Sequence, residues 1–513
     1  MDKYGKTKET ANRIALIERL ADSPDGSELD VHRPSVFATE DAVFFLARQG
    51  ASKVIGVVGE RGGLAGTHYP LSTDNGDEQL HLCPPTVENV AALRQRLPFL
   101  MPRPLGLSRS FGLGDRLGLA TPAHAEALRA CRDGDMAPIF AQQSVRENSR
   151  TGRTPQQVLD DATLGAFQAG WQDGYGADAD HLKRIADVDE HLAAGYTFYT
   201  IDSGDHVDDS GHTATGSTLE ALFERLPWDV LESTVQDTLR RYADVLFDLE
   251  HFQLTITGEQ VRRAAAKYGA AVAHTVTLAR HIASRSPHDA HEIEMSLDET
   301  EYPTSLAEHL YIAGELKRLG VEPVSMAPRY RGRFEKGVDF IGDPVAFGAE
   351  FERHLAIARE FGPYKLSLHS GSDKLTLYPI MARLSPEGAF HVKTAGTSYL
   401  EALRTIAAVA PPLFRRILRL GHERFDTDRA TYHISGDRAL AADPETVVDA
   451  ELTALLDEFH TRQILHVTFG SVLQDPELKA ATLATLRTHE KIYHEMLLSH
   501  FAKHFSLFEA GTR

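Results

Sequence analysis

The stretch Gly174-Tyr-Gly-Ala-Asp-Ala-Asp-His-Leu-Lys183 is a short run, flanked by apolar residues, that leads into two carboxylates and a histidine. Two later runs, Glu292-Ile-Glu-Met-Ser-Leu-Asp-Glu299 and Lys365-Leu-Ser-Leu-His-Ser-Gly-Ser-Asp373, end in the same kinds of residue. In (β/α)8 barrels the catalytic residues lie at the carboxyl ends of the strands. The three runs therefore predict strands that deliver acids and histidines to one site.

Short β-like runs alternate with helical stretches from about residue 105 onward, which is the pattern of parallel βα units. A doubly wound sheet shows the same alternation, but nearly every run here ends in polar residues, and this favours a barrel. We therefore expect a TIM-like (β/α)8 barrel. The expected strands are 116–120, 137–142, 175–180, 196–202, 292–298, 322–329, 364–369 and 390–395.

Other parts of the chain lack this alternation. The Pro-rich passage from Pro98 to Pro104 is typical of a boundary. The capping box Thr257-Gly-Glu-Gln260 predicts the start of a long helix that runs through Arg285. We expect an N-terminal α/β appendage over residues 1–100, the barrel over 101–405 with a helical insertion at 210–287, and a mostly helical C-terminal extension over 406–513.

The composition is that of a soluble globular protein, since 42% of the 513 residues are hydrophobic and 25% are charged. The formal net charge of -19 argues against nucleic acid or an anionic membrane as the main partner, although a few Arg and Lys residues suffice for a small anionic substrate. Two cysteines are too few for a disulfide framework or a Cys-based zinc site. The N-terminal residues are polar, and no apolar run approaches the ~18 residues of a membrane span. We expect a cytoplasmic protein, and the sequence leaves homo-oligomerisation open.

Asp178, Asp180 and His181 form the first candidate site group. Neutral imidazole is the commonest transition-metal ligand, and a carboxylate beside it can act as a general base. The alternative for these three residues is a solvated turn. His369, which is followed by small residues, is the best single ligand candidate, against a histidine that only ends a strand. His206 is either a further ligand or part of a polar loop.

Glu292 and Glu294 alternate on one face of a predicted strand. Carboxylates that point into a barrel are costly unless they meet a metal, a cation or a substrate. We therefore expect at least one of them to be functional, and Glu294 is the preferred acid or base.

Cations that could bind a substrate carboxylate cluster near two predicted strand ends. Arg329 and Lys393 lie close to the ends themselves, and Arg331, Arg333 and Lys336 follow in one loop. Ordinary surface charge is the alternative for each of them.

Several motifs together resemble one family, the tagaturonate epimerases of hexuronate breakdown. The motifs spread over about residues 105–475, and the N-terminal part carries little of the match. They are Phe140-Ala-Gln-Gln-Ser-Val-Arg-Glu-Asn148 with Thr151-Gly-Arg-Thr154, Gly176-Ala-Asp-Ala-Asp-His181, Ser296-Leu-Asp-Glu-Thr-Glu301, Leu368-His-Ser-Gly-Ser-Asp-Lys374, His391-Val-Lys-Thr-Ala-Gly-Thr-Ser-Tyr-Leu-Glu401 and His466-Val-Thr-Phe-Gly-Ser-Val472.

The resemblance implies a metal-dependent isomerase that interconverts D-tagaturonate and D-fructuronate. It implies Asp180 as general base, Glu294 as general acid, and His181 and His369 as metal ligands. His433 is our prediction for the third protein ligand. The alternatives for that position are His391, Glu335 and Asp339. Related enzymes have been turned toward free ketohexoses, so a 4-epimerase of fructose and tagatose is an alternative function.

The two ketoacids differ at a carbon β to the ketone, whose C–H bond the carbonyl does not acidify. Inversion there requires either transient oxidation or retro-aldol cleavage, rotation of the aldehyde and re-addition. The glycines between Gly112 and Gly118 do not fit a dinucleotide fingerprint, so we expect the retro-aldol route with a divalent metal as Lewis acid. Mixed His and carboxylate ligation fits Zn, Mn, Ni or Co. A metal-dependent sugar-acid aldolase and a sugar-acid binding protein are the remaining alternatives.

Overall fold

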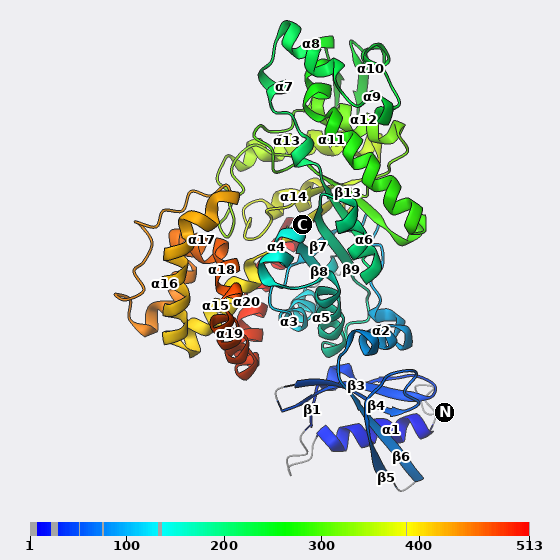
Figure 1. The fold of residues 1–513 in the computed structure, drawn as a ribbon, viewed down its shortest axis with the longest axis vertical. Helices are drawn as coiled ribbons and strands as arrows, with labels where there is room; N and C mark the ends of the chain where they lie inside the picture. Colours follow the sequence, from blue (N-terminus) through cyan, green and yellow to red (C-terminus); the bar gives the residue numbers. More distant parts are fainter. Residues whose placement is uncertain are drawn as a thin grey trace.

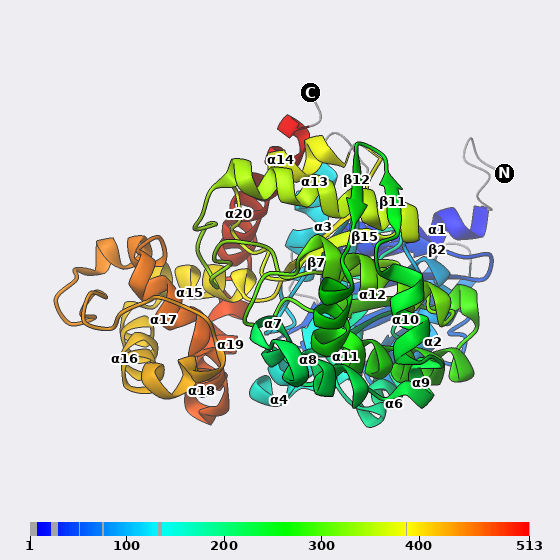
Figure 2. The ribbon, with the colours of Figure 1, turned by 90° about the horizontal axis from the view of Figure 1, so that it is seen from above.

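The computed structural model describes residues 8–21, 29–50, 52–73, 76–131, 136–385 and 387–511. Figure 1 shows a central barrel with a sheet-and-helix unit at one end, a helical insertion at the other, and a lobe of C-terminal helices at one side. Figure 2, seen from above, shows this lobe standing beside the barrel. Within the described residues, no helix has the length and apolar character that crossing a membrane requires.

Parallel strands close into a barrel in the order β10-β13-β14-β15-β16-β7-β8-β9, which confirms the expected TIM-like fold. The strands are β7 (Ser110–Leu113), β8 (Ala137–Ser144), β9 (Gly176–Leu182), β10 (Phe198–Asp202), β13 (Glu292–Ser296), β14 (Ser325–Ala327), β15 (Lys365–Leu368) and β16 (Phe390–Thr394). The helices that follow these strands are α3 (Thr121–Ala130), α4 (Val145–Thr151), α5 (Pro155–Gln168), α6 (Ile185–Ala194), α12 (Leu306–Arg318), α13 (Pro344–Phe361), α14 (Tyr378–Leu384) and α15 (Thr397–Val409).

The first barrel strand lies earlier than predicted. The expected strand at 116–120 is a loop, and the strand is β7, which pairs with β16 and β8. The loop is fixed by Asp115, whose carboxylate accepts hydrogen bonds from the backbone N–H groups of Leu117, Gly118 and Ala120. Gly118 also has a φ of +72°, which a strand residue does not adopt. The apolar residues of this stretch therefore pack as a loop.

The N-terminal unit is an antiparallel sheet with one helix, α1 (Lys8–Ala21). Alternate residues of β3 face opposite sides: Val43 and Phe45 pack in the cluster with α1, whereas Phe44 and Leu46 join the main core of the barrel. The strand β3 is thus buried on both faces. Its strands are β1 (Leu29–Val31), β2 (Phe37–Ala38), β3 (Ala42–Gln49), β4 (Ser52–Gly59), β5 (Thr67–Thr73) and β6 (Gly76–Cys83), and α2 (Val87–Arg96) leads to the barrel.

The insertion between β10 and β13 is built around a long helix, α11 (Gly258–Arg285). The predicted capping box is present, since Thr257 accepts from the backbone of Gln260 and the Gln260 side chain reaches back to Thr257. The insertion also contains an antiparallel hairpin that the sequence did not predict, β11 (Leu246–Leu249) with β12 (Phe252–Thr255). Its short helices are α7 (Ser210–Thr213), α8 (Gly216–Glu224), α9 (Trp228–Leu231) and α10 (Val235–Tyr242).

The C-terminal helices leave the barrel and then return to it. Phe505 and Phe508 of the last helix contact Phe111 of β7, so this helix packs on the barrel wall. The helices are α16 (Pro411–Asp428), α17 (Phe459–Val467), α18 (Phe469–Gln474), α19 (Pro476–Thr488) and α20 (Glu490–Gly511).

Candidate active site

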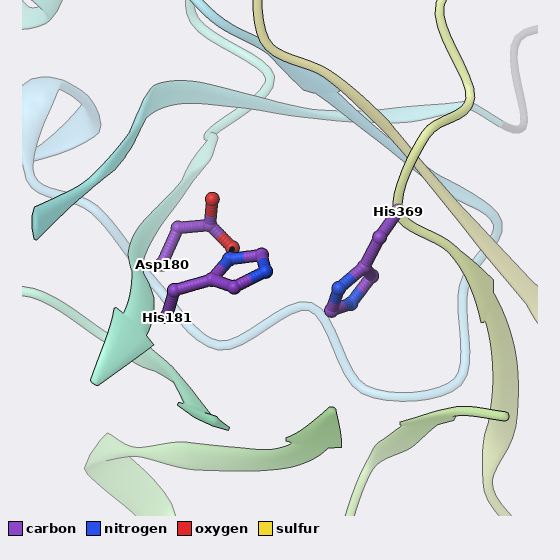
Figure 3. Close-up of side chains that lie close together, drawn as sticks. All are labelled: Asp180, His181 and His369. Carbon is purple, nitrogen blue, oxygen red and sulfur yellow. Dashed lines mark hydrogen bonds and ion pairs between the residues drawn. The ribbon is translucent and has the colours of Figure 1, made fainter. Parts of the chain in front are cut away.

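Asp180, His181 and His369 meet at the carboxyl end of the barrel (Figure 3). One ligand atom from each lies within 4.8 Å of those from the other two, and the two imidazole ring centroids are 5.2 Å apart. Asp180 and His181 come from the end of β9, and His369 directly follows β15. The structure thus brings together the acid and both histidines that the sequence singled out.

A β-bulge lets β9 turn two consecutive side chains toward this site. Tyr199 of β10 pairs with Ala179, but Ile201 pairs with Leu182. Two residues of β9, Asp180 and His181, therefore lie opposite the single residue Thr200 of β10. His181 has a φ of +58°, in the left-handed region that is uncommon for a histidine. Bulges of this kind re-aim side chains beside active sites.

The ammonium group of Lys393 lies at the centre of three carboxylates. Lys393 is 1% exposed, and its Nζ is 2.8 Å from Asp178 Oδ2, 2.8 Å from Asp180 Oδ1 and 2.8 Å from Glu294 Oε1. It also donates to the Thr200 hydroxyl. Four different barrel strands contribute to this network, so its geometry depends on barrel closure.

This network sets the charges of the three carboxyls. Burial raises the pKa of each, but Lys393 and a neighbouring histidine outweigh burial and hold the pKa of Glu294 well below its usual range. For Asp180, burial is outweighed in the same way by His181 and Lys393, and the pKa is again low. Asp178 differs, because burial prevails over Lys393 and raises its pKa to about 7. Asp180 and Glu294 are therefore ionised at neutral pH, and Asp178 is the carboxyl that carries a proton most readily.

Both histidines are flanked by carboxylates. His369 Nε2 is 2.6 Å from Glu294 Oε1, and its Nδ1 is 3.1 Å from Asp298 Oδ1. Burial lowers the pKa of His369, but the two carboxylates prevail and raise it to about 9. His181 Nδ1 is 2.8 Å from Asp180 Oδ1, which outweighs burial and raises the pKa of His181 to about 10.

These residues fit a divalent metal ion. Among the described residues, the buried His181 Nε2 and Glu294 Oε2 have no hydrogen-bond partner. A metal-binding histidine usually donates its other N–H to a carboxylate, and Asp180 and Asp298 take that place for His181 and His369. Imidazole nitrogens with carboxylate oxygens suit Zn, Mn, Ni and Co.

His433, the predicted third ligand, does not join this cluster. It is exposed, on the loop that follows a short 3-10 helix at 429–431, and the cluster's third donor is Asp180. His206 is exposed and stacks on His274, with ring centroids 4.1 Å apart. The sequence could not distinguish these two histidines from residues of the site, because each lies in a long connecting segment whose path the sequence does not specify.

Glu292 and His391, which the sequence also considered, lie at the opposite end of the barrel. Glu292 accepts from the backbone N–H of Leu105, and His391 Nδ1 is 2.9 Å from the hydroxyl of Ser110. Both are at or next to the first residue of their strand, so they support the amino end. Arg329 is half-buried and donates to the backbone carbonyl of Asp298.

Thr200 and Gln142 are site residues that the sequence did not reveal. Thr200 Oγ1 lies 2.8 Å from Asp178 Oδ1 and 3.1 Å from Glu294 Oε1. Gln142 Nε2 donates to Asp180 Oδ2 over 3.4 Å. Alternation along the strand at 196–202 indicates which side chains point inward, but a single threonine among them does not indicate a function.

A closed parallel barrel with histidines and carboxylates at its strand ends places the chain in the class of TIM-barrel enzymes. A family model described as tagaturonate epimerase, UxaE, matches residues 32–508. The chain belongs to this family.

Similar proteins cover nearly the whole chain. The tagaturonate/fructuronate epimerase of Thermotoga maritima is 40% identical over 484 residues, which are 94% of this chain and 98% of that protein. The native crystal structure of the fructuronate-tagaturonate epimerase UxaE from Cohnella laeviribosi is 34% identical, with a TM-score of 0.86, and the match covers 97% of this chain and 99% of that one. A glycerol complex of the same protein is 33% identical, with a TM-score of 0.87 and the same coverage.

Proposed function

We propose that this chain interconverts D-tagaturonate and D-fructuronate, with a bound divalent metal ion, by retro-aldol cleavage and re-addition. The observation that carries the proposal is the contact of Asp180 and Glu294 with one ammonium group, beside two histidines, in a chain 40% identical to a tagaturonate/fructuronate epimerase. The reducing cytosol is the expected location.

His181 and His369 are the proposed metal ligands, because they lie together at the strand ends and Nε2 of His181 has no hydrogen-bond partner among the described residues. A divalent ion supplies Lewis acidity toward substrate oxygens. The chain supplies the orientation of the two imidazoles, through Asp180 on one ring and Asp298 on the other.

Asp180 begins the reaction as the proposed base. It is ionised at neutral pH and fully buried, so it can take the proton of the hydroxyl on the inverting carbon. The bond between that carbon and the next one toward the ketone then breaks, and its electron pair forms the enediolate of dihydroxyacetone. The other product is the aldehyde tartronate semialdehyde. Rotation of this aldehyde and re-formation of the bond on its opposite face give the epimer.

Glu294 is the proposed acid, and its low pKa means that it must receive a proton before it can return one. Lys393 contacts both Asp180 and Glu294 through the same Nζ atom. It therefore keeps both groups ionised between turnovers and provides a short path for a proton from one to the other. The reverse reaction exchanges the two roles, as an epimerase requires.

A stereochemical assay tests this proposal. The purified enzyme is stripped of metal, Mn, Ni, Co or Zn is added back, and D-tagaturonate is followed by NMR. D-Fructuronate that forms only with metal supports the proposal and identifies the ion. Net release of dihydroxyacetone and tartronate semialdehyde would instead indicate an aldolase, and binding without conversion a sugar-acid binding protein.

A further inference from the structure

The turn at residues 335–338, after β14, is held on several sides. Lys374 donates to the backbone carbonyls of Glu335 and Val338, and the Glu335 carboxylate accepts from Ser435 and Gln463 of the C-terminal lobe. Arg462 donates to the carbonyl of Gly337, and Gln463 also donates to the carbonyl of Lys336. The backbone that carries Lys336 is thus fixed by groups from two other parts of the fold.

The Lys336 side chain is bound far less than its backbone. Its Nζ donates to the hydroxyl of Ser370 over 2.9 Å, and among the described residues no carboxylate lies within ion-pair distance of it. Lys336 is half-buried, so this ammonium group has lost part of its hydration, and Asp298 and Glu299 act on it only from beyond ion-pair distance. A partly desolvated ammonium group that has no direct ion pair suits an anionic ligand.

Lys336 points toward the site. Its partner Ser370 directly follows His369, the residue in contact with Glu294. Burial raises the pKa of Glu299, whereas the charges of His181, Arg146 and, less strongly, Lys336 lower it. The ammonium group therefore lies at the rim of the site, near the β15 loop.

The neighbouring cations differ from Lys336 in their partners. Lys393 is occupied by three carboxylates, Arg333 lies 3.6 Å from Glu335, and Arg331 lies 3.7 Å from Glu350 with its side chain 78% exposed. Lys393, which the sequence suggested for a substrate carboxylate, has its ammonium group committed inside the protein. Arg329 donates to the backbone carbonyl of Asp298.

We propose that Lys336 binds the carboxylate of the hexuronate and so sets the preference for sugar acids over neutral ketohexoses. The inference rests on the proposed function, because it assigns one end of that substrate. The ketone end lies at the histidine pair, and the carboxylate is at the opposite end of the carbon chain. The carboxylates at the centre of the site repel an anion. A cation at the rim therefore holds the substrate carboxylate there and directs the ketone end into the site.

D-Fructuronate and D-fructose provide a matched pair of ligands, because they differ only in having a carboxylate or a CH2OH group at the last carbon. The experiment measures kcat/KM for both, in the native protein and in Lys336→Met, Lys336→Arg and Arg331→Met. Where fructose turnover is too slow to follow, fructose is instead tested as a competitive inhibitor of fructuronate conversion, and its inhibition constant is measured.

We expect Lys336→Met to lower kcat/KM for D-fructuronate by about 10- to 100-fold, mainly through KM, and to change the fructose constant by less than about threefold. Lys336→Arg should keep most of the preference, and Arg331→Met should match the native protein. An equal loss on both ligands would mean a structural role, and no loss on either would place the carboxylate elsewhere; both outcomes overturn the inference. Failure of the native protein to convert fructuronate would instead contradict the proposed function.

Discussion

The Nζ atom of Lys393 lies 2.8 Å from Oδ1 of Asp180, although 213 residues separate the two along the chain. The same atom also contacts Asp178 and Glu294, so one buried cation balances three buried carboxylates. A charge removed from such a network leaves its partners buried and unpaired, which costs more than the pair contributes when intact. Lys393 therefore supports both the fold and the chemistry of the site.

Replacing Lys393 with Met should lower the free energy of unfolding by about 3–5 kcal/mol and abolish measurable epimerisation. Urea unfolding followed by circular dichroism measures the first effect. Lys365→Met is the matched control, because Lys365 is equally buried on the neighbouring strand and, among the described residues, donates to Ser108 and Ser110 and has no ion pair. Burial lowers its pKa to about 8, although Glu292 and Glu294 act in the opposite direction. That control should change stability by less than about 1.5 kcal/mol. Equal losses in the two variants would show that volume, and not charge, explains the effect.

Asp180→Asn should reduce kcat by about 10²–10⁴-fold, because the amide cannot accept the substrate proton. The two histidines stay in place, so metal content measured by mass spectrometry should remain near that of the native protein. Asp178→Asn is the comparison: Asp178 contacts Lys393 but not His181, and its raised pKa already leaves it partly protonated at neutral pH. We expect a loss below about tenfold for Asp178→Asn, and near-normal turnover of Asp180→Asn would remove Asp180 from the mechanism.

His181→Ala and His369→Ala should each lower metal affinity by at least about 10- to 100-fold. His433→Ala should keep full metal content, because His433 is exposed and outside the donor cluster. Equilibrium dialysis against Zn or Mn measures all three variants without reference to activity. Metal loss in His433→Ala would restore the ligand that the sequence predicted and would require the loop at 431–435 to close over the site.

The barrel was predictable because its strands have a local signature. Seven of the eight expected runs overlap observed strands, since each is a short apolar segment that ends in polar residues. The exception is β7, four residues with a central glycine, beside a more apolar loop that Asp115 holds in place. Hydrophobicity alone favours that loop over the strand, and the capping hydrogen bonds that decide the matter are not visible in a periodic pattern.

The site was predictable where adjacent residues carry the chemistry, as in Asp180 with His181. The role of Lys393 was not, because an ammonium group near a strand end looks the same in sequence whether it faces a substrate or three carboxylates. The bulge that turns His181 inward depends on how β9 pairs with β10, which strand sequences do not specify. His433 failed to join the cluster for a related reason, since its position follows from packing of the C-terminal lobe.

Histidines buried away from the site should make the protein sensitive to acid. His124 of α3 is fully buried, bonds to the Ser398 hydroxyl over 2.9 Å, and packs against Phe501 with ring centroids 4.6 Å apart. Burial lowers its pKa to about 4, although Asp115 acts in the opposite direction. The ordinary pKa of a histidine is 6.5, so as the pH falls below about 6.5 the unfolded chain binds a proton that the folded protein does not. Stability is therefore present above pH 6.5 and is lost as the pH falls toward 4.

This histidine alone should cost about 2 kcal/mol of unfolding free energy between pH 7.5 and pH 5.0. Urea unfolding at the two pH values should show that His124→Gln loses about that much less than the native protein over the same interval, because glutamine does not titrate. His433→Gln serves as the control for an exposed histidine and should follow the native curve. If His124→Gln loses as much stability as the native protein, the acid sensitivity arises elsewhere, and the other buried histidines, His354 first, become the groups to replace.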